Sequence, residues 1–461
     1  MRSLVVNDEG RATPVGDAEL DAVTARVAAG LAERGVGRGD VVAVQLPKGV
    51  LWLAVLRALW QLGAVSLPCP ELLSQTEVAD RVERSGAMLA LLAEDDVPQA
   101  DGTLPRHQGS PEDPAFLLFT SGTEGGPKGA LHRRSYVEAN RLQSERWMGV
   151  RAGDRVWCTA ATGWSKSLRN VWMAAELCGA EAVLHRGRFD PDQRLALIAE
   201  LRPDVLCMSP TEYRRCASAA SFGDRPLAVR EAVAAGETLD APTVERWREA
   251  YGIVVRDGYG QTETGAVTGV LAGDEAGAGA MGRPLPGVDV RVDDGELCVV
   301  SSTLPTFFAG YWNDPRATAA ALRDGLWHTG DLVRREVDGS LHYEGRRDDV
   351  ISSSGYRIGP GEVEAALRSH PAVAEAAAVG LPDPERGQIV HADVVLAHGV
   401  AGSDELADAL RDHVRGATAA YKYPRSIRFV AALPHTPTGK LQRSEVRRSL
   451  AAAGGSAEPS D

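Results

Sequence analysis

The 461-residue sequence lacks the patterns of several large protein classes. Its six cysteines form no C-x-x-C pair and show no metal-ligand spacing, so we expect free buried thiols and neither a disulfide framework nor a zinc site. No apolar run is long enough to span a bilayer, since the most apolar early stretch, residues 50–65, is interrupted by Arg57 and Gln61. Residues 1–10 lack the apolar core of a signal peptide, which predicts a cytoplasmic protein.

Charge and composition limit the partners of the chain. The formal net charge of −13 argues against a general nucleic-acid or anionic membrane surface. A hydrophobic content of 44% and a mean hydropathy of −0.17 are typical of globular proteins. Because the chain is too long for one ordinary core, we expect a large domain with a smaller companion.

Helices and strands alternate in the first part of the chain. Helical spacing over residues 18–34 precedes a strand at 40–45, a helix at 50–62 and a strand at 65–67, and a similar alternation covers 156–208. This alternation predicts an α/β fold with parallel, helix-covered sheets. Beyond about residue 287 the pattern changes to short strands with turns, which predicts a small barrel-like subdomain.

A segment of another kind begins near Asp348. Two short helices, at 363–367 and 406–414, alternate with strands at 373–379 and 392–396, as in a small α+β domain. The predicted organisation is therefore a large N-terminal domain (1–347), a small mobile C-terminal lid domain (348–450) with its hinge at Asp348, and a disordered tail (451–461).

Residues 118–129, LFTSGTEGGPKG, run from an apolar strand into a loop rich in hydroxyls and glycines. Glycines allow backbone N–H groups to approach phosphate oxygens, Ser121 and Thr123 offer hydroxyls to phosphate or Mg²⁺, and Lys128 adds a positive charge. The loop is not a Walker A loop, because its spacing differs and Pro127 precedes the lysine. A phosphate-binding loop is the hypothesis, and a flexible surface loop is the alternative for this stretch taken alone.

Five further motifs follow in order: YGQTETG at 259–265, WHTGD at 327–331, GRRDDVI at 345–351, SSGYRIGP at 353–360 and PTGK at 437–440. With the phosphate loop they resemble the adenylate-forming superfamily of acyl-CoA synthetases, adenylation domains and luciferases. The segment 353–360 is most similar to medium-chain acyl-CoA synthetases. The resemblance covers nearly the whole chain.

The resemblance implies an ATP-dependent acid:CoA ligase, with ATP, Mg²⁺ and CoA as cofactor or co-substrates. A carboxylate attacks the α-phosphate and releases pyrophosphate, and the acyl-adenylate then forms a thioester. Negative charge that gathers on the phosphorus requires a metal ion, cationic side chains and backbone donors. The implied catalytic residues are Lys440, between the carboxylate and the α-phosphate, Thr262 at the α-phosphate and Glu263 on Mg²⁺, with Thr123 as a second metal ligand.

The resemblance also implies a nucleotide site. Asp331 matches a ribose ligand and Arg346 a ribose or phosphate contact, and Tyr259 matches the aromatic residue that stacks on adenine. Glu124 departs from the family, where many members have a hydroxyl residue. The full predicted nucleotide-binding set is Thr120, Ser121, Gly122, Thr123, Lys128, Gly236, Glu237, Thr238, Asp257, Gly258, Tyr259, Gly260, Gln261, Asp331, Arg346 and Arg357.

Two further sites are implied. Ser354, Gly355 and Tyr356 are the expected CoA contacts, since a glycine there allows the pantetheine arm to pass close to backbone. The predicted acyl pocket consists of Trp164, Lys166, Tyr259, Gly260 and Gly265. Gly260 stands where acetate-specific members have a tryptophan that closes the pocket floor, so we expect an acid larger than acetate, either medium-chain, aromatic or polycyclic.

Two other interpretations stay open. An adenylating ligase that loads an acyl carrier protein in natural-product biosynthesis would share every ATP motif. A non-catalytic acyl-nucleotide-binding protein is opposed by the presence of Lys440, Glu263 and Asp331 together. Taken singly, Asp331 is equally a turn aspartate and Lys440 a solvated turn lysine. The sequence leaves the acid, the pathway and the oligomeric state open.

Overall fold

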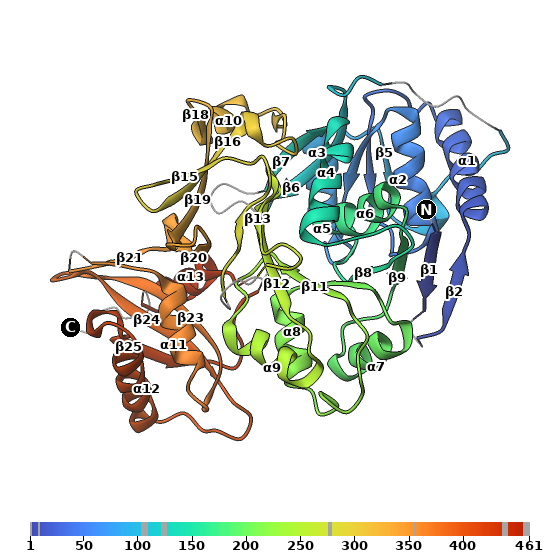
Figure 1. Ribbon diagram of the computed structural model, residues 1–461. Coiled ribbons are helices and arrows are strands. Elements are labelled where there is room, and N and C mark those ends of the chain that lie inside the picture. Colours follow the sequence, from blue (N-terminus) through green and yellow to red (C-terminus); the bar gives the residue numbers. More distant parts are fainter. Residues whose placement is uncertain are drawn as a thin grey trace. The chain divides into compact units, whose positions relative to one another are not determined.

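The computed structural model describes residues 2–7, 10–102, 109–120, 127–274, 279–354, 356–435 and 441–454. The chain forms two compact units, and Figure 1 shows its helices and strands coloured along the sequence. Unit 1 comprises Met1–Arg291, Val299–His328 and Val337–Leu341, and unit 2 comprises Val292–Cys298, Thr329–Glu336 and His342–Asp461. Unit 2 thus takes in segments that precede Asp348, and the hinge at that residue stays a prediction.

Two sheets form the frame of unit 1. The six-stranded sheet has the order β17 (Gly310–Tyr311), β7 (Lys128–Arg133), β6 (Pro114–Thr120), β4 (Val65–Pro68), β3 (Val41–Val44) and β5 (Leu89–Leu91). The nine-stranded sheet has the order β14 (Arg283–Pro284), β13 (Gly265–Gly269), β12 (Val255–Gln261), β11 (Glu231–Ala235), β10 (Val205–Met208), β8 (Arg155–Cys158), β9 (Glu181–His185), β1 (Arg2–Val6) and β2 (Ala12–Val15). The strands β1 and β2 were not expected from the sequence.

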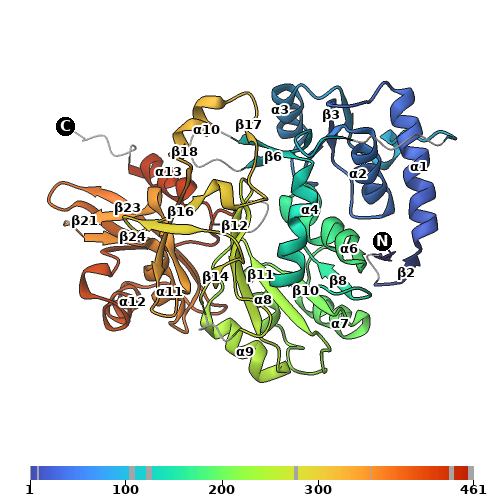
Figure 2. The same ribbon diagram turned by 45° about the horizontal axis from the view of Figure 1, so that its top comes forward.

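Helices cover these sheets in layers. The α-helices of unit 1 with at least five residues are α1 (Asp17–Glu33), α2 (Val50–Leu62), α3 (Gln75–Ser85), α4 (Ser135–Leu142), α6 (Ala174–Cys178), α7 (Pro191–Leu201), α8 (Pro210–Ala217), α9 (Ala241–Tyr251) and α10 (Pro315–Ala321). Helices α1, α2, α4 and α6 share one core with both sheets, and α7, α8 and α9 share a second core with the nine-stranded sheet. Helices α1 and α2 lie side by side in both views (Figures 1 and 2).

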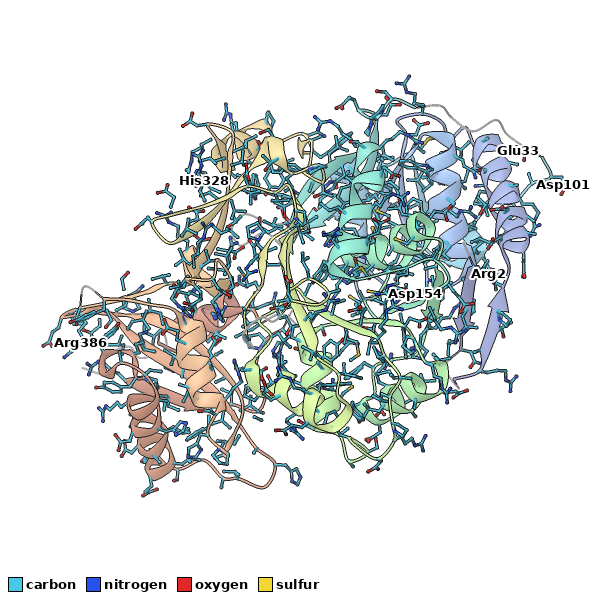
Figure 3. The ribbon with its side chains drawn as sticks, in the orientation of Figure 1. Arg2, Glu33, Asp101, Asp154, His328 and Arg386 are labelled. Atoms are coloured by element: carbon cyan, nitrogen blue, oxygen red, sulfur yellow. The ribbon has the colours of Figure 1, made fainter. Side chains whose placement is uncertain are left out.

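The alternation of side chains along the strands explains this layering. In β3, Val42 and Val44 pack into the core that contains α1 and α2, whereas Val41 and Ala43 pack into a separate core on the other face. An ion pair also connects the start of β8 to the segment before β11. Asp154, labelled in Figure 3, lies just before β8 and its Oδ1 is 2.8 Å from Nη1 of Arg230.

Unit 2 contains a five-stranded sheet with the order β22 (Tyr356–Ile358), β21 (Ile351–Ser353), β24 (Gly387–Leu396) and β23 (Val373–Asp383), and with β25 (Ser426–Phe429) beside β24. Helices α11 (Pro360–Arg368) and α12 (Asp404–Ala417) bury Val363, Leu367 and Leu410 against it. Helix α13 (Arg443–Gly454) extends four residues into the tail that was predicted to be disordered, and alanine, a strong helix former, occupies the first three of these positions.

A further five-stranded sheet contains the short strands that were predicted after residue 287. Its strands are β15 (Val290–Asp293), β16 (Glu296–Val300), β19 (Leu326–Arg335) and β18 (Leu322–Arg323), with β20 (Leu341–Arg346) beside β19. The predicted fold class is confirmed. All six cysteines are free, and five of them are buried. No helix within the described ranges has the length and apolar content to cross a membrane.

Candidate active site

Strands β6 and β7 bring the two ends of the predicted phosphate loop together. They pair in antiparallel fashion, and Thr120 lies opposite Lys128. Ser121, Gly122, Thr123 and Glu124 lie outside the described residues. The expected strand before the loop is therefore confirmed, while the roles of these four residues remain predictions.

Lys128 and Glu263 contact the same aromatic residue. The Lys128 Nζ atom lies 5.3 Å from the centre of the Tyr311 ring, and the Tyr311 hydroxyl donates a hydrogen bond of 2.7 Å to Oε1 of Glu263. The Glu263 side chain is buried. The structure thus brings the predicted phosphate lysine and the predicted metal ligand into one cluster, although they are far apart in sequence.

The turn that carries Thr262 and Glu263 connects β12 to β13, and each of its carbonyls is bonded. His132 Nε2 lies 2.8 Å from the Thr262 carbonyl, the Phe308 backbone N–H donates to Glu263, and the Thr306 hydroxyl donates to Thr264. These bonds fix the backbone of the turn, as preorganised catalysis requires.

His132, on β7, was not expected from the sequence. Burial lowers its pKa to about 3, so the ring is neutral at physiological pH. Because a carbonyl can only accept, Nε2 carries the proton in the bond to Thr262. One strand therefore supplies both Lys128 at the end of the phosphate loop and the residue that positions Thr262.

The predicted adenine turn lies beside the Tyr259 segment. Strands β11 and β12 are parallel, and Ala235 pairs with Gly258, so Gly236 and Tyr259 follow at the same sheet edge. Ligands of open α/β sheets bind at this edge. Gly236 has φ of +103°, which favours glycine.

Arg214, on α8, supports that turn. Its Nη2 lies 3.0 Å from Glu237, and its Nη1 donates to the Thr238 carbonyl at 3.1 Å. The Thr211 hydroxyl also donates to Glu237. The Glu237 carboxylate therefore serves to anchor its own turn.

Asp257 and Gly258 lie within β12. A Cβ atom on Gly258 would come within 2.4 Å of the Trp147 ring, so the glycine allows this close packing. Burial raises the pKa of Asp257 to about 8. The carboxyl group is thus largely protonated at neutral pH.

Lys166 is the cation of the predicted acyl pocket, and its side chain is partly buried. Its Nζ atom donates to the Met208 and Ala235 carbonyls, each at 3.1 Å, at the carboxyl ends of β10 and β11. Burial by itself lowers the pKa of Lys166, but Cys207 and other neighbours outweigh it and the net pKa is raised. The lysine stays charged at the sheet edge where Gly236 follows β11.

The structure corrects the interpretation of Gly260. A Cβ atom at this position would lie 1.9 Å from the Gly265 carbonyl oxygen and 2.9 Å from the Ala266 Cα. The β12–β13 pairing has an irregularity between Tyr259 and Gly260, which brings the two backbones together. The glycine therefore meets a backbone contact and does not open a pocket floor, so the size of the acid cannot be argued from it.

In unit 2, the predicted ribose ligands contact each other. Nη1 of Arg346, at the end of β20, lies 3.2 Å from Oδ1 of Asp331 on β19 and donates to the Thr329 carbonyl at 2.9 Å. A Cβ at Gly330 would lie 2.8 Å from Nη2 of Arg346, and φ of Gly330 is +70°. The glycine in the WHTGD motif therefore allows the arginine to approach.

The predicted CoA contacts lie on the hairpin of β21 and β22. Ser354 has φ of +51°, as two-residue hairpin turns require. Tyr356 is exposed and stacks on Tyr421, with ring centres 4.2 Å apart and an angle of 15° between planes. Gly355 lies outside the described residues, and only the backbone of Arg357 is described.

Lys440 also lies outside the described residues. Residues before and after it in the sequence, His435, Leu441 and Arg443, make contacts that the structure describes. His435 and Leu441 form an isolated antiparallel bridge. Arg443 binds Glu364 through two bonds of 2.7 and 2.8 Å, and its Nη1 lies 3.3 Å from Asp349. These ion pairs connect the segment after the PTGK motif to helix α11 and to the neighbour of the predicted hinge residue.

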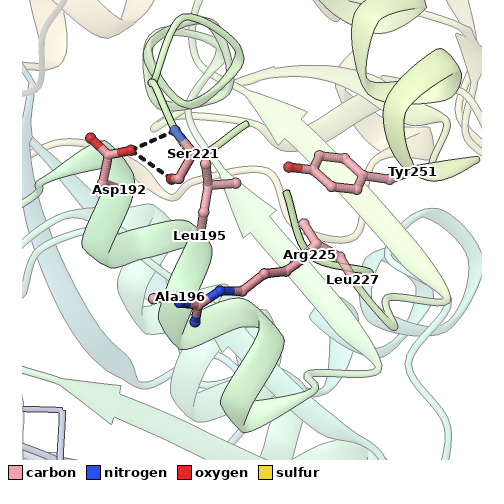
Figure 4. Close-up of a pocket in the computed structure, with 7 residues that line it drawn as sticks. All are labelled: Asp192, Leu195, Ala196, Ser221, Arg225, Leu227 and Tyr251. Atoms are coloured by element: carbon pink, nitrogen blue, oxygen red, sulfur yellow. Dashed lines mark hydrogen bonds between the residues drawn. The ribbon is translucent and has the colours of Figure 1, made fainter. Parts of the chain in front are cut away.

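A pocket elsewhere in unit 1 belongs to no predicted site (Figure 4). It has a volume of about 180 Å³ and includes Asp192, Ser221, Arg225 and Tyr251 in its lining. The Ser221 hydroxyl and backbone N–H both bind Asp192, so this polar wall is already hydrogen-bonded.

Tyr311, His132 and Arg214 are the contributors that the sequence analysis missed. Each acts through a contact with a residue distant in sequence, and none belongs to a motif that was singled out. Of these three residues, only His132 could have been found from the sequence, because it follows the predicted Lys128 by four residues in the same strand, β7.

Comparisons with known proteins show the family of the chain. The family model described as AMP-binding enzyme matches residues 17–108 and 91–312, and the model of the AMP-binding enzyme C-terminal domain matches 362–440. An uncharacterized acyl–CoA ligase of Bacillus subtilis, YtcI, is 36% identical over 467 residues, with 92% of this chain and 88% of the relative covered. The mitochondrial acyl-coenzyme A synthetase ACSM4 of Rattus norvegicus is 33% identical over 464 residues, with coverages of 90% and 80%.

A solved structure of an anthranilate CoA ligase in complex with anthranoyl-AMP matches with a TM-score of 0.88 and 26% identity, covering 98% of this chain and 95% of the ligase. The chain belongs to the family of AMP-binding enzymes. The predicted membership of the adenylate-forming superfamily, close to medium-chain acyl-CoA synthetases, is confirmed, and so is the predicted enzyme class of acyl-CoA synthetase.

Proposed function

We propose that this acyl-CoA synthetase activates a carboxylic acid larger than acetate with ATP and transfers the acyl group to CoA. The observation that carries the proposal is the shared contact of Lys128 and Glu263 with Tyr311. It brings a cation for the phosphates, at the start of β7, close to a carboxylate for a metal ion, in the turn between β12 and β13. The anthranilate CoA ligase supports an acid larger than acetate.

The residues near the loop fit a magnesium ion. Mg²⁺ prefers oxygen ligands and in nucleotide sites is bound by one or two carboxylates together with substrate phosphates. Glu263 supplies one buried carboxylate, and Thr123 is the proposed second protein ligand. When bound, the ion neutralises charge on the phosphates of ATP.

In the first half-reaction the carboxylate oxygen of the acid attacks the α-phosphorus and pyrophosphate leaves. Lys128 stabilises the leaving phosphates by its charge, and Thr262, with its carbonyl bonded to His132, contacts the α-phosphate. Lys440 is proposed to lie between the two reacting anions, a task that suits the point charge of a lysine. Asp331, oriented by Arg346, accepts hydrogen bonds from the ribose.

In the second half-reaction the CoA thiol attacks the acyl carbonyl and AMP leaves. We assign the arm of CoA to the hairpin of Ser354 and Tyr356. An acyl carrier protein as acceptor is the alternative, since the ATP site would be identical.

A single assay series tests the proposal. Pyrophosphate release is measured for a panel of carboxylic acids with and without CoA, and acyl-CoA is identified by mass spectrometry. We expect an acid-dependent rate, a thioester product, and a loss of about 10²–10³-fold in kcat for Glu263→Gln. Glu200→Gln, at an exposed position on α7, is the control and should behave as the unmodified enzyme.

No acid-dependent pyrophosphate release from any acid would contradict the proposed function. Pyrophosphate release without acyl-CoA would reject CoA as the acceptor. A thioester formed only with a phosphopantetheinylated carrier protein would establish the alternative.

A further inference from the structure

Arg169 lies in an unusual helical segment beside the predicted acyl pocket. The residues from Ser165 to Cys178 form one run in which the middle part, η3 (Leu168–Met173), is π-helical. Such segments are rare and are frequent at functional sites. Arg169 follows Lys166 by three residues, within this segment.

The guanidinium group of Arg169 has no counter-ion among the described residues. Its Nε and Nη1 atoms are buried and find no acceptor there. Two buried arginines of unit 1 are paired with carboxylates: Arg194 lies 3.0 Å from Glu212, and Arg256 lies 2.8 Å from Glu231. An unpaired charge that is shielded from water is costly, and a ligand of opposite charge offsets that cost.

The group faces the hairpin of the predicted acyl site. A Cβ atom on Gly265 would lie 3.4 Å from Nη1 of Arg169. The same Cβ atom would lie 2.8 Å from the Thr306 hydroxyl oxygen, and φ of Gly265 is +70°, which favours glycine.

The neighbours of Arg169 are polar but uncharged. Burial raises the pKa of Tyr136, and the charge of Arg169 is the largest influence that opposes the rise. Burial likewise keeps His132 neutral. Side-chain hydrogen bonds from Asn140 and Arg169 also lower the pKa of Tyr136, and within the described part of the chain the His132 Nδ1 atom has no hydrogen-bond partner. A donor set of this kind, with one arginine and one phenol, suits a carboxylate.

We propose that Arg169 binds a second carboxylate at the distal end of the acid, so that the substrates are dicarboxylic acids. This inference rests on the proposed function, because it assigns the end of the acyl group that does not react with ATP. Arg169 forms charge-assisted hydrogen bonds with the distal carboxylate, while the other carboxylate attacks the α-phosphate. A monocarboxylic acid of equal length leaves the guanidinium unpaired and is a poorer substrate.

The test compares matched pairs of acids: succinate with butanoate, adipate with hexanoate, and terephthalate with benzoate. Pyrophosphate release gives kcat/KM for the unmodified enzyme, for Arg169→Met, and for the control Arg146→Met, which changes an exposed arginine of the neighbouring π-helical segment Gln143–Trp147. For at least one pair we expect a preference of tenfold or more for the dicarboxylate. Arg169→Met should lose about 100-fold on that dicarboxylate and keep or gain activity on the monocarboxylate, and Arg146→Met should retain the original preference.

Ligand-induced shifts of the melting temperature give a readout that does not depend on turnover. The preferred dicarboxylate should raise the melting temperature of the unmodified enzyme and of Arg146→Met, but not of Arg169→Met. Pyrophosphate release from monocarboxylates alone, without stabilisation by any dicarboxylate, would overturn the role of Arg169 and leave the ligase function intact. Stabilisation by a dicarboxylate without pyrophosphate release from any acid would support Arg169 and overturn the ligase function. Equal losses of Arg169→Met on both members of a pair would also overturn the proposal, because the arginine would then serve the reacting carboxylate or the fold.

Discussion

At the scale of single residues, the charged side chains of the predicted site contact one another or share a neighbour. Lys128 and Glu263 share one phenol, and Arg346 fixes one oxygen of Asp331. None of these side chains acts alone. A residue-scale variant is therefore informative when it removes one charge and leaves its neighbours in place.

The first residue-scale prediction concerns Lys440. Lys440→Ala should reduce adenylate formation by about 10²–10³-fold, because the charge is needed at the α-phosphate during the first step. Thioester formation from a supplied acyl-adenylate should change much less. Rapid-quench measurements of the two half-reactions test this prediction. Lys440→Arg, which keeps the positive charge, serves as the comparison variant. Equal losses in both steps would remove the assignment.

The second concerns Asp257 and pH. Its pKa is about 8 in the folded chain and about 3.8 when unfolded, so unfolding releases a proton between these values. The wild-type free energy of unfolding therefore carries a penalty that grows as pH rises from about 4 to about 8. Asp257→Asn removes that penalty.

The free energy of unfolding of Asp257→Asn, relative to the unmodified protein, should increase by up to about 1.4 kcal/mol for each pH unit in that window. Urea unfolding at pH 5, 6, 7 and 8 measures it. Asp101→Asn, at an exposed position, is the matched control and should show no such trend. A difference that stays constant with pH would mean that Asp257 is ionised in the folded chain.

At the scale of secondary-structure elements, the β12–β13 hairpin is the part on which the predicted site depends most. It carries Tyr259, Thr262 and Glu263, and its turn carbonyls are bonded to other elements. The close approach of its two backbones leaves no room for a side chain at Gly260.

Gly260→Ala should therefore destabilise the protein by about 1–3 kcal/mol or more, because the added methyl group meets backbone that cannot move aside cheaply. Activity should fall for short and long acids alike. Urea unfolding and kcat/KM for acetate and hexanoate measure the two effects. Gly416→Ala, where the added Cβ atom meets nothing within 4 Å, is the control and should be neutral or mildly stabilising. A selective loss of the longer acid would restore the pocket-floor interpretation.

At the scale of the whole molecule, two half-reactions must use one nucleotide site. The resemblance implies that the C-terminal lid changes position between them, with Asp348 as the hinge. Asp348 lies in the short 3-10 helix η5 (Arg347–Asp349), and its neighbour Asp349 binds Arg443 and Arg447. The Asp348 side chain is about half exposed, and its Oδ2 lies 3.8 Å from Nη2 of Arg346.

Asp348→Pro should block the change of backbone dihedrals at the hinge, because proline fixes φ. We expect ATP–pyrophosphate exchange to survive and overall CoA ligation to fall by at least about tenfold. Asp348→Ala, which keeps the backbone free, should retain both activities. Full CoA ligation by the proline variant would place the hinge elsewhere.

The sequence by itself determined the fold class and the enzyme family, because periodicity and short motifs are local properties. The 13-residue helix α2 has the predicted bounds, Val50–Leu62, and β3 and β10 lie where apolar runs indicated strands. The order of the six motifs was sufficient for the family.

Only the tertiary structure decided which residues act together. The pairing of β12 with β13 showed that Gly260 is required by the backbone, and the packing around η3 showed that Arg169 lacks a counter-ion within the described residues. Tyr311 contacts Glu263 from 48 residues away. Such contacts depend on how separate strands and helices approach one another, and no local pattern records that distance.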